Sequence, residues 1–160
     1  MDEYRCPPQE LPLHLYRVQY RNTRTVYNKS SGLEARDTTT LYNKSGFDDD
    51  FIQAVQNQFT WGHKGRTPFI SFFSDEEHAT KWGYSLKGWG RSSSNDDWTL
   101  LTIDTSCLQN VYVFKLSTLI DRMGVQIPKK AMDSHKPGGY ICLHRIPACA
   151  ISSVRTGSDI

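Results

Sequence analysis

The sequence lacks the features that mark membrane proteins and exported proteins. No run approaches the ~20 consecutive apolar residues that a membrane-spanning helix needs. The first ten residues, MDEYRCPPQE, contain neither the basic segment nor the following apolar segment of a secretion signal. We therefore expect a cytoplasmic protein with no membrane partner.

Cysteine is scarce, and its spacing does not suit a metal site. Cys6, Cys107, Cys142 and Cys149 form no CxxC pair, and no histidines follow them at the spacing of a zinc finger. We interpret Cys142 and Cys149 as small buried apolar residues. No metal site is expected.

The chain also has no large excess of either charge, since its formal net charge is +2. The charges are unevenly distributed. Residues 1–45 contain seven Lys and Arg against five Asp and Glu, residues 46–112 contain five against nine, and residues 113–160 contain seven against three. Basic ends around an acidic middle could place a phosphate-rich partner on one face, although ordinary solvated surface charge explains the same pattern.

Aromatic residues are plentiful in the 160-residue chain, which has four Trp, eight Tyr and seven Phe. A chain of this length buries roughly two-thirds of its unfolded surface, so we expect a single domain over residues 1–160. The Pro-Pro pair and weak pattern of residues 1–10 predict a loosely ordered terminus.

The spacing of apolar residues predicts a mixture of strands and helices. Strands are expected at 14–20, 67–73, 98–105, 110–116 and 138–147, with a short strand at 35–40 inside the polar stretch 21–46. Helices are expected at 47–59, 74–82 and 117–124, the second of them opened by Ser74 with Glu77 as a capping box. The stretches 88–97 and 128–139 read as a mobile loop and a polar connection. Strands predominate, which favours an α+β fold with mostly antiparallel pairing.

Three segments together resemble the ADP-ribosyltransferase fold: HLYRV, TPFISFFSDEEHA and HRIPACAI. In that family an Arg on an early strand, a Ser in an FxSxS-type strand and a Glu on a late strand before an Ile-Pro turn surround NAD. Arg17 matches the arginine and Ser71 the first serine. The resemblance implies two packed, mostly antiparallel sheets with a few short helices.

The same segments depart from the family where its chemistry is done. Phe72 and Phe73 stand where the second and third hydroxyls would be, and Gly139, beside Tyr140, stands where the glutamate should be. No Asp or Glu occurs in residues 134–158. The family's glutamate hydrogen-bonds the nicotinamide ribose and stabilises oxocarbenium character, which glycine cannot do. We therefore expect a transferase-like scaffold with different chemistry.

Over nearly its whole length the chain also resembles a family of short fungal proteins that includes arginine-containing cyclodipeptide synthases. The quoted string is LYRV…DTTT…TPFISFFSDEEHA…W…IDT…VFKLS…IP…GGYICLHRIPACAI. This resemblance implies an enzyme of fungal secondary metabolism that joins arginine from Arg-tRNA to a second aminoacyl-tRNA and forms a cyclo-Arg-Xaa diketopiperazine. An aminoacyl ester is already activated, so the reaction needs neither ATP nor a metal, and no cofactor is expected.

Such a reaction requires a base for an α-amino group and a group that stabilises an oxyanion. We assign the base to His144, whose ordinary pKa is suitable. Arg17 would hold a phosphate or the oxyanion, and Ser71 would hydrogen-bond there or form an aminoacyl ester. We expect His144 to enter the same cleft, on the side of its strand that carries Tyr140 and Cys142. The structural alternatives are a histidine that bonds a backbone carbonyl and a serine that bonds a neighbouring strand.

The substrates themselves need further side chains. A carboxylate should pair with the arginine side chain, and Asp75 is the first candidate, with Glu76 or Asp104 behind it. Aromatic side chains should stack on adenine or the second amino acid, and basic side chains should follow the acceptor-stem phosphates. The aromatic candidates are Tyr16, Trp82 and Tyr140, and the basic candidates are Arg21, Arg24, Lys129 and Lys130. Asp75 could instead complement a helix dipole, and Trp82 could belong to the core.

Two other functions remain open. The first is an NAD-dependent ADP-ribosyltransferase or NAD glycohydrolase, with NAD as the partner in place of aminoacyl-tRNA. The second is a binding module that has kept the transferase fold without catalysis.

Overall fold

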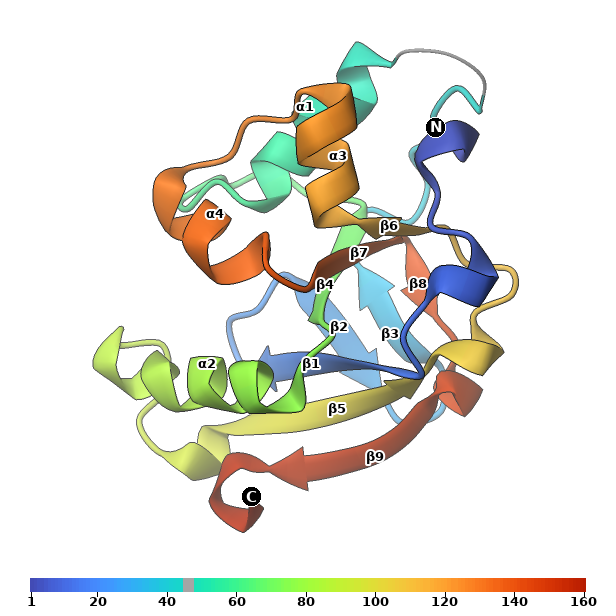
Figure 1. Ribbon diagram of the computed structural model, residues 1–160. Helices are drawn as coiled ribbons and strands as arrows, with labels where there is room; N and C mark the ends of the chain where they lie inside the picture. Colours follow the sequence, from blue (N-terminus) through green and yellow to red (C-terminus); the bar gives the residue numbers. More distant parts are fainter. Residues whose placement is uncertain (45–47) are drawn as a thin grey trace.

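Two antiparallel sheets with helices packed against the larger one form the computed structural model, which describes residues 1–44 and 48–160 (Figure 1). The strands are β1 (His14–Tyr20), β2 (Thr25–Asn28), β3 (Gly32–Ala35), β4 (Phe69–Phe73), β5 (Trp98–Asp104), β6 (Val113–Lys115), β7 (Gly139–Leu143), β8 (Arg145–Ile146) and β9 (Ile151–Thr156). The helices are α1 (Asp49–Gln58), α2 (Glu76–Gly88), α3 (Leu116–Met123) and α4 (Lys129–His135). Short 3₁₀ turns are η1 (Asp2–Tyr4), η2 (Pro8–Glu10), η3 (Asn95–Asp97), η4 (Thr105–Cys107), η5 (Ala148–Ala150) and η6 (Gly157–Asp159).

The larger sheet has six strands in the order β6-β7-β4-β1-β5-β9, and the smaller has three in the order β2-β3-β8. Every strand pair is antiparallel. The expected α+β class, with two antiparallel sheets and a few helices, is therefore confirmed.

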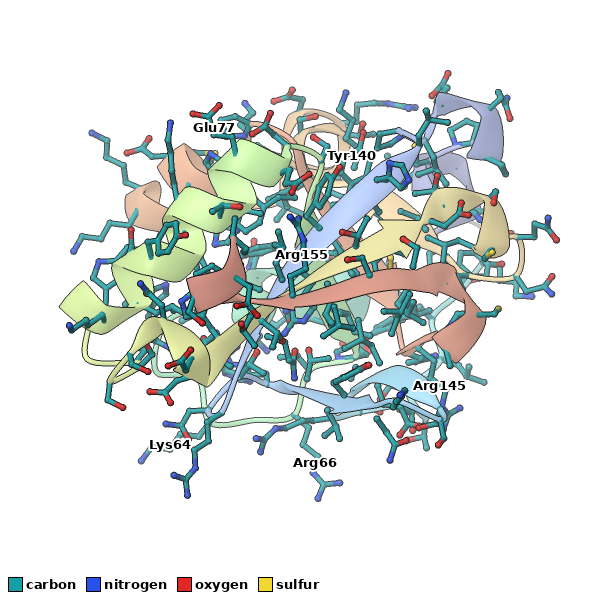
Figure 2. The ribbon with its side chains drawn as sticks, turned by 90° about the horizontal axis from the view of Figure 1, so that it is seen from below. Lys64, Arg66, Glu77, Tyr140, Arg145 and Arg155 are labelled. Carbon is teal, nitrogen blue, oxygen red and sulfur yellow. The ribbon has the colours of Figure 1, made fainter. Side chains whose placement is uncertain are left out.

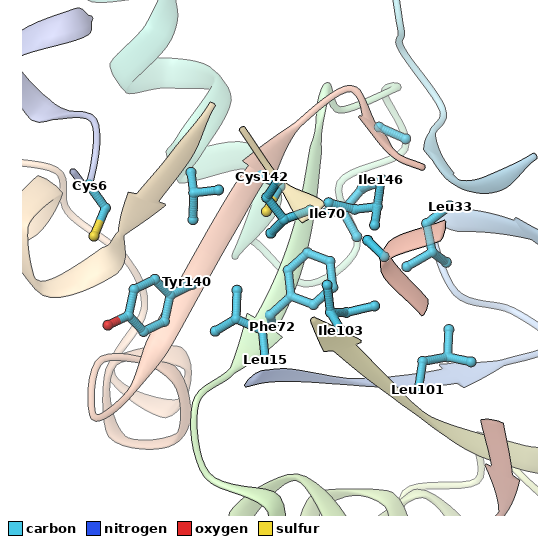
Figure 3. Close-up of a cluster of buried hydrophobic side chains, with 14 residues drawn as sticks. Cys6, Leu15, Leu33, Ile70, Phe72, Leu101, Ile103, Tyr140, Cys142 and Ile146 are labelled. Carbon is cyan, nitrogen blue, oxygen red and sulfur yellow. The ribbon is translucent and has the colours of Figure 1, made fainter. Parts of the chain in front are cut away.

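The core follows from the alternation of apolar residues along the strands. On one face of the larger sheet, Ile70, Phe72 and Leu101 pack against Leu33 and Ile146 of the smaller sheet, as Figure 3 shows. On the opposite face, Phe69 and Ile141 pack under α1 and α3, and Val18 and Leu100 pack under α2. Each strand of the larger sheet thus has a face toward the second sheet and a face toward helices.

Strands β1 and β4 separate soon after they meet, and this divergence positions the site. β1 pairs with β5 over seven residues, and β4 pairs with β7 over five. Between β1 and β4 the only Cα pairing is Tyr16 with Phe73. Beyond that point the polar groups on the facing edges of the two strands need other partners.

Several boundaries differ from the sequence-based expectation because local capping groups decide them. The expected strand at 35–40 is wrong: β3 ends at Ala35, and the Asp37 carboxylate then accepts hydrogen bonds from the amides of Thr39 and Thr40, which forms a turn. Asp48 caps α1 by accepting from two amides. The expected start of that helix at residue 47, and the end of the expected polar stretch at residues 45–46, lie outside the described residues.

The second helix is capped one residue later than expected. The Asp75 carboxylate, not the Ser74 hydroxyl, accepts from the His78 amide, and α2 continues to Gly88. The loop that follows begins with an ordered reversal, because the Arg91 amide donates to Leu86 O and the Gly90 amide to Lys87 O, with Gly90 in the left-handed region.

Three further expectations are corrected near the C-terminus. Cys149, expected to be buried, is exposed, whereas Cys142 is buried as expected. The stretch 128–139 is not only a connection, since it contains α4, which buries Ala131. The expected strand at 138–147 is broken at His144, whose φ of 64° turns the chain from β7 in the larger sheet into β8 in the smaller one.

The first ten residues are held against the fold, contrary to expectation. Met1 and Cys6 are buried, and the Arg5 guanidinium donates to the carbonyls of Gln109 and Val111 and lies over the ring of Tyr112. Within residues 1–44 and 48–160, none of the helices has the length and apolar character needed to cross a bilayer.

Candidate functional site

A cleft of about 420 Å³ opens where β1 and β4 diverge. Its lining contains four cationic side chains, which are Arg17, Arg24, Lys64 and Arg91. It also contains five aromatic side chains, which are Tyr20, Phe59, Trp61, Phe73 and Trp82. None of the described lining residues is an Asp or a Glu. A cleft with this lining suits a ligand that carries both negative charge and a flat ring.

Arg17 lies at the point of divergence, with 6 % of its surface exposed. Its guanidinium donates to the Ser71 carbonyl at 2.9 Å, to Thr23 Oγ1 at 2.7 Å and to Gln19 Oε1 at 3.0 Å. The first bond satisfies a β4 carbonyl that β1 leaves unpaired. No carboxylate of the described residues forms an ion pair with Arg17, and burial lowers the pKa of Arg17 to about 10. A buried cation without an anionic partner is costly, which points to an anionic ligand.

Ser71 faces the cleft from the middle of β4. Its hydroxyl oxygen accepts from Gln58 Nε2 at 3.1 Å, and Gln58 Oε1 in turn accepts from Thr67 Oγ1 at 2.6 Å. This chain fixes the serine side chain and leaves its hydroxyl proton available to a ligand.

A histidine that the sequence did not single out forms part of the cleft. His135, the last residue of α4, stacks on Phe73 with ring centroids 5.2 Å apart and an interplanar angle of 11°. Phe73 and Ser71 point to the same face of β4, so the imidazole lies on the side of the sheet that carries the Ser71 hydroxyl. Burial, and secondarily the charge of His78, lower the pKa of His135 to about 4. The imidazole is therefore neutral at physiological pH and can accept a hydrogen bond.

The depressed pKa of His135 makes stability depend on pH. The unfolded chain protonates this histidine near pH 6.5 and the folded protein only near pH 4, so stability is lost as the pH falls through that interval. At about 1.4 kcal/mol per pKa unit, the total loss is about 3 kcal/mol. We expect urea unfolding at pH 6.5 and 4.5 to show a smaller difference for His135→Phe than for the wild type. Equal differences would contradict a buried neutral imidazole, and His14→Phe, at an exposed position, is the control.

Arg24 has a different role from the one expected. Its guanidinium donates to the carbonyls of Asn57, Gln58, Thr60 and His63, at 2.9 to 3.4 Å. These contacts order the segment that follows α1 and carries Trp61 and Lys64 into the cleft lining. Arg24 thus lines the cleft, but its hydrogen-bonding capacity is largely used by the protein itself.

The structure brings Arg17, Ser71 and Trp82 to one cleft and places His144 elsewhere. The His144 ring bonds the Thr40 carbonyl at 2.7 Å, and the residue lines a separate hollow near Cys107 and Cys149. The β4 and β7 register explains this, because Ser71 faces Ile141 and shares its side of the sheet, whereas residues 140 and 142 point to the other side. The structural alternative for His144, a bond to a backbone carbonyl, is the arrangement found. Figure 2 shows its neighbour Arg145 at the opposite end of the smaller sheet from Lys64 of the cleft.

The other expected substrate-binding side chains lie outside the cleft. Tyr140 is buried beside Cys6, at the end of the cluster away from the smaller sheet (Figure 3), and Tyr16 packs beside the cluster under α2. Asp75 caps α2, Asp104 caps η4 by accepting from the Ser106 amide, and Glu76 pairs with Arg155. No carboxylate from this set is available in the cleft to read a substrate guanidinium.

The remaining basic candidates do not line the cleft either. Arg21 is exposed just after β1, and Lys129 and Lys130 are exposed at the start of α4. The residues that sequence reasoning missed are Gln58, Trp61, Arg91 and His135. One signal was present for His135, because Ala131 and His135 are four residues apart and so share one face of a helix.

Comparison with known proteins gives one result. The model of the family described as "Domain of unknown function (DUF7587)" matches residues 10–160. No match was found among curated proteins. Because the matched region covers nearly the whole sequence, including every side chain that lines the cleft, the chain belongs to the DUF7587 family.

Proposed function

We propose that the protein is an aminoacyl-tRNA-dependent cyclodipeptide synthase that acts on arginine and a second amino acid. The observation that carries the proposal is Arg17, a buried cation without a carboxylate partner, at the centre of an aromatic cleft that also exposes Ser71. An adenosine-ended substrate with a phosphate and an ester carbonyl matches this combination of ring, negative charge and developing oxyanion. The reaction would take place in the cytoplasm, where charged tRNA is made.

The reaction needs two acyl transfers, and both balance without a further reactant. In the first, the α-amine of one aminoacyl ester attacks the carbonyl of the other, and the released ribose oxygen takes up the proton that the amine loses. In the second, the free amine of the dipeptidyl ester attacks its own ester carbonyl and closes the six-membered ring. Each step passes through an oxyanion that a guanidinium can stabilise.

The cleft residues supply plausible groups for these steps. Arg17 keeps unused N–H donors for the oxyanion or the terminal phosphate, since three acceptors occupy only part of its five. The Ser71 side chain leaves the opposite face of the sheet from Arg17, so its hydroxyl would donate to a second oxygen of the substrate. His135, neutral because its pKa is near 4, would accept a hydrogen bond from the attacking amine and orient it, and the ribose oxygen that leaves would take up the proton. The three come from β1, β4 and α4.

The ADP-ribosyltransferase likeness of the sequence is compatible with this arrangement. Divergence of β1 and β4, with an arginine and a serine facing the opening, supports a fold of that type. NAD remains the second candidate ligand, because a pyrophosphate also suits Arg17. The absence of a carboxylate from the described cleft lining favours acyl transfer over cleavage of a glycosidic bond.

The decisive experiment supplies purified protein with tRNA charged with arginine and with each of the twenty amino acids in turn. A cyclo-Arg-Xaa product, identified by mass spectrometry, is the expected result. All twenty are needed because nothing in the described cleft lining identifies the second amino acid. A parallel reaction with NAD monitors nicotinamide release. Failure to form any diketopiperazine from intact charged tRNA would overturn the proposal. Nicotinamide release would instead support an NAD-dependent transferase or glycohydrolase.

A further inference from the structure

A row of aromatic rings leads from solvent into the cleft. Trp61 and Trp89 are 55 % and 46 % exposed, unusually open for tryptophan. Their ring centroids are 6.1 Å apart, and Trp89 is 5.7 Å from Trp82, which in turn is 6.1 Å from Phe73 on the cleft floor. The row is continuous from the surface to the stacked pair of Phe73 and His135.

The row is built by segments from distant parts of the chain. Trp61 lies on the segment whose carbonyls accept hydrogen bonds from Arg24. Trp89 is the C-cap of α2, and the ordered reversal at Gly90 follows it directly. Arg91 links the segment of Trp89 to the segment of Trp61, because its guanidinium lies 4.4 Å from the Trp61 ring centroid. Its Nη1 also donates to the Tyr20 hydroxyl. Because both segments are held by specific hydrogen bonds, the exposed rings are presented in fixed positions.

Positive charge accompanies the exposed rings. Arg91 and Lys64 both line the cleft, and Lys64 projects outward from the ribbon (Figure 2). Exposed rings interleaved with cations form a surface on which successive nucleobases stack while their phosphates meet the cations. An apolar peptide would use the rings but not the charge, so the surface favours a single-stranded nucleic acid.

We propose that Trp61, Trp89 and Arg91 bind the unpaired nucleotides that precede the terminal adenosine of the substrate, so that the substrate enters as a single strand. This inference rests on the proposed function only for the identity of the terminal nucleotide. The row is long enough for more than one base, so affinity should rise with the number of unpaired nucleotides. Base stacking on aromatic side chains tolerates any sequence, so the identity of these nucleotides should matter little.

The test compares AMP with the single-stranded tetranucleotide ACCA by calorimetry and tryptophan fluorescence. For the wild type we expect the tetranucleotide to bind at least tenfold more tightly than AMP, and more tightly than the same sequence in a duplex. In Trp61→Leu and Trp89→Leu this gain should largely disappear. AMP binding should be unchanged in Trp89→Leu, because Trp89 does not line the cleft. Tyr84→Leu is the matched control, because Tyr84 is a 40 % exposed aromatic on α2 that does not line the cleft. It should behave as the wild type.

Each outcome separates this inference from the proposed function. Tetranucleotide binding that depends on Trp61 and Trp89, without any diketopiperazine from charged tRNA, supports the stacking surface and rejects the synthase. Diketopiperazine formation with an unchanged KM for charged tRNA in both tryptophan variants supports the synthase and overturns the stacking surface. Equal binding of AMP and ACCA by the wild type also overturns it.

Discussion

Arg17→Met is expected to lower the rate of diketopiperazine formation about 100-fold or more while the protein stays folded. A donor aimed at a developing oxyanion contributes roughly 100- to 1000-fold to the rate. Stability should change by no more than about 2 kcal/mol, because methionine removes the cost of burying a charge and no carboxylate is left unpaired. Single-turnover kinetics with charged tRNA and a thermal melt measure the two effects.

The matched control is Arg122→Met. Arg122 lies over the ring of Tyr4 and does not line the cleft, so its loss should change turnover by less than twofold. Binding of ADP, which carries an adenosine and two phosphates, gives a readout that does not depend on the reaction. If Arg17→Met unfolds the protein, or retains both turnover and ADP affinity, then Arg17 serves only to bridge β1 and β4.

Several strands, and the places of Arg17 and Ser71 on two of them, were predictable because alternation and short motifs are local. The period of two over residues 14–20 gives β1 with its observed bounds and puts Arg17 on the face of β1 opposite Tyr16 and Val18. Ser71 lies in the middle of an apolar run whose length fits one strand. These properties depend on neighbouring residues alone, so they can be predicted from the local sequence pattern.

The positions of His144 and His135 relative to the cleft were not predictable because they depend on long-range pairing. Alternation predicts which face a side chain points to only while the strand continues. β7 ends at Leu143, and the next residue, His144, donates its amide to the Pro68 carbonyl. Whether residues 140 and 142 share a face with Ser71 follows from the register of β4 against β7, which no local pattern reveals. His135 was missed for a related reason, since α4 is short and polar and is stabilised by packing rather than by its own propensity.

Gly139 occupies the place of the glutamate expected from the transferase resemblance, so its surroundings bear on the choice between the two proposed enzymes. It pairs with Phe73, so a side chain here would point to the same face as Ser71. That space is filled by the end of α4. A Cβ on Gly139 would lie 1.9 Å from the His135 carbonyl oxygen, a backbone atom that cannot move without displacing the helix. The end of α4, which carries His135, therefore occupies the space that a side chain at position 139 would need.

Gly139→Ala is accordingly expected to destabilise the protein by about 3 kcal/mol, the upper end of the usual cost of overpacking, because α4 must shift. For a protein of this size the melting temperature should fall by about 6–12 °C. Gly88→Ala is the control, since nothing lies within 4 Å of its added Cβ and alanine favours helix; its melting temperature should be unchanged or higher.

Gly139→Glu should be less stable than Gly139→Ala and should release no nicotinamide from NAD. A stable Gly139→Glu variant that hydrolyses NAD would show that α4 can shift to admit a carboxylate. Packing at Gly139 would then not exclude NAD chemistry.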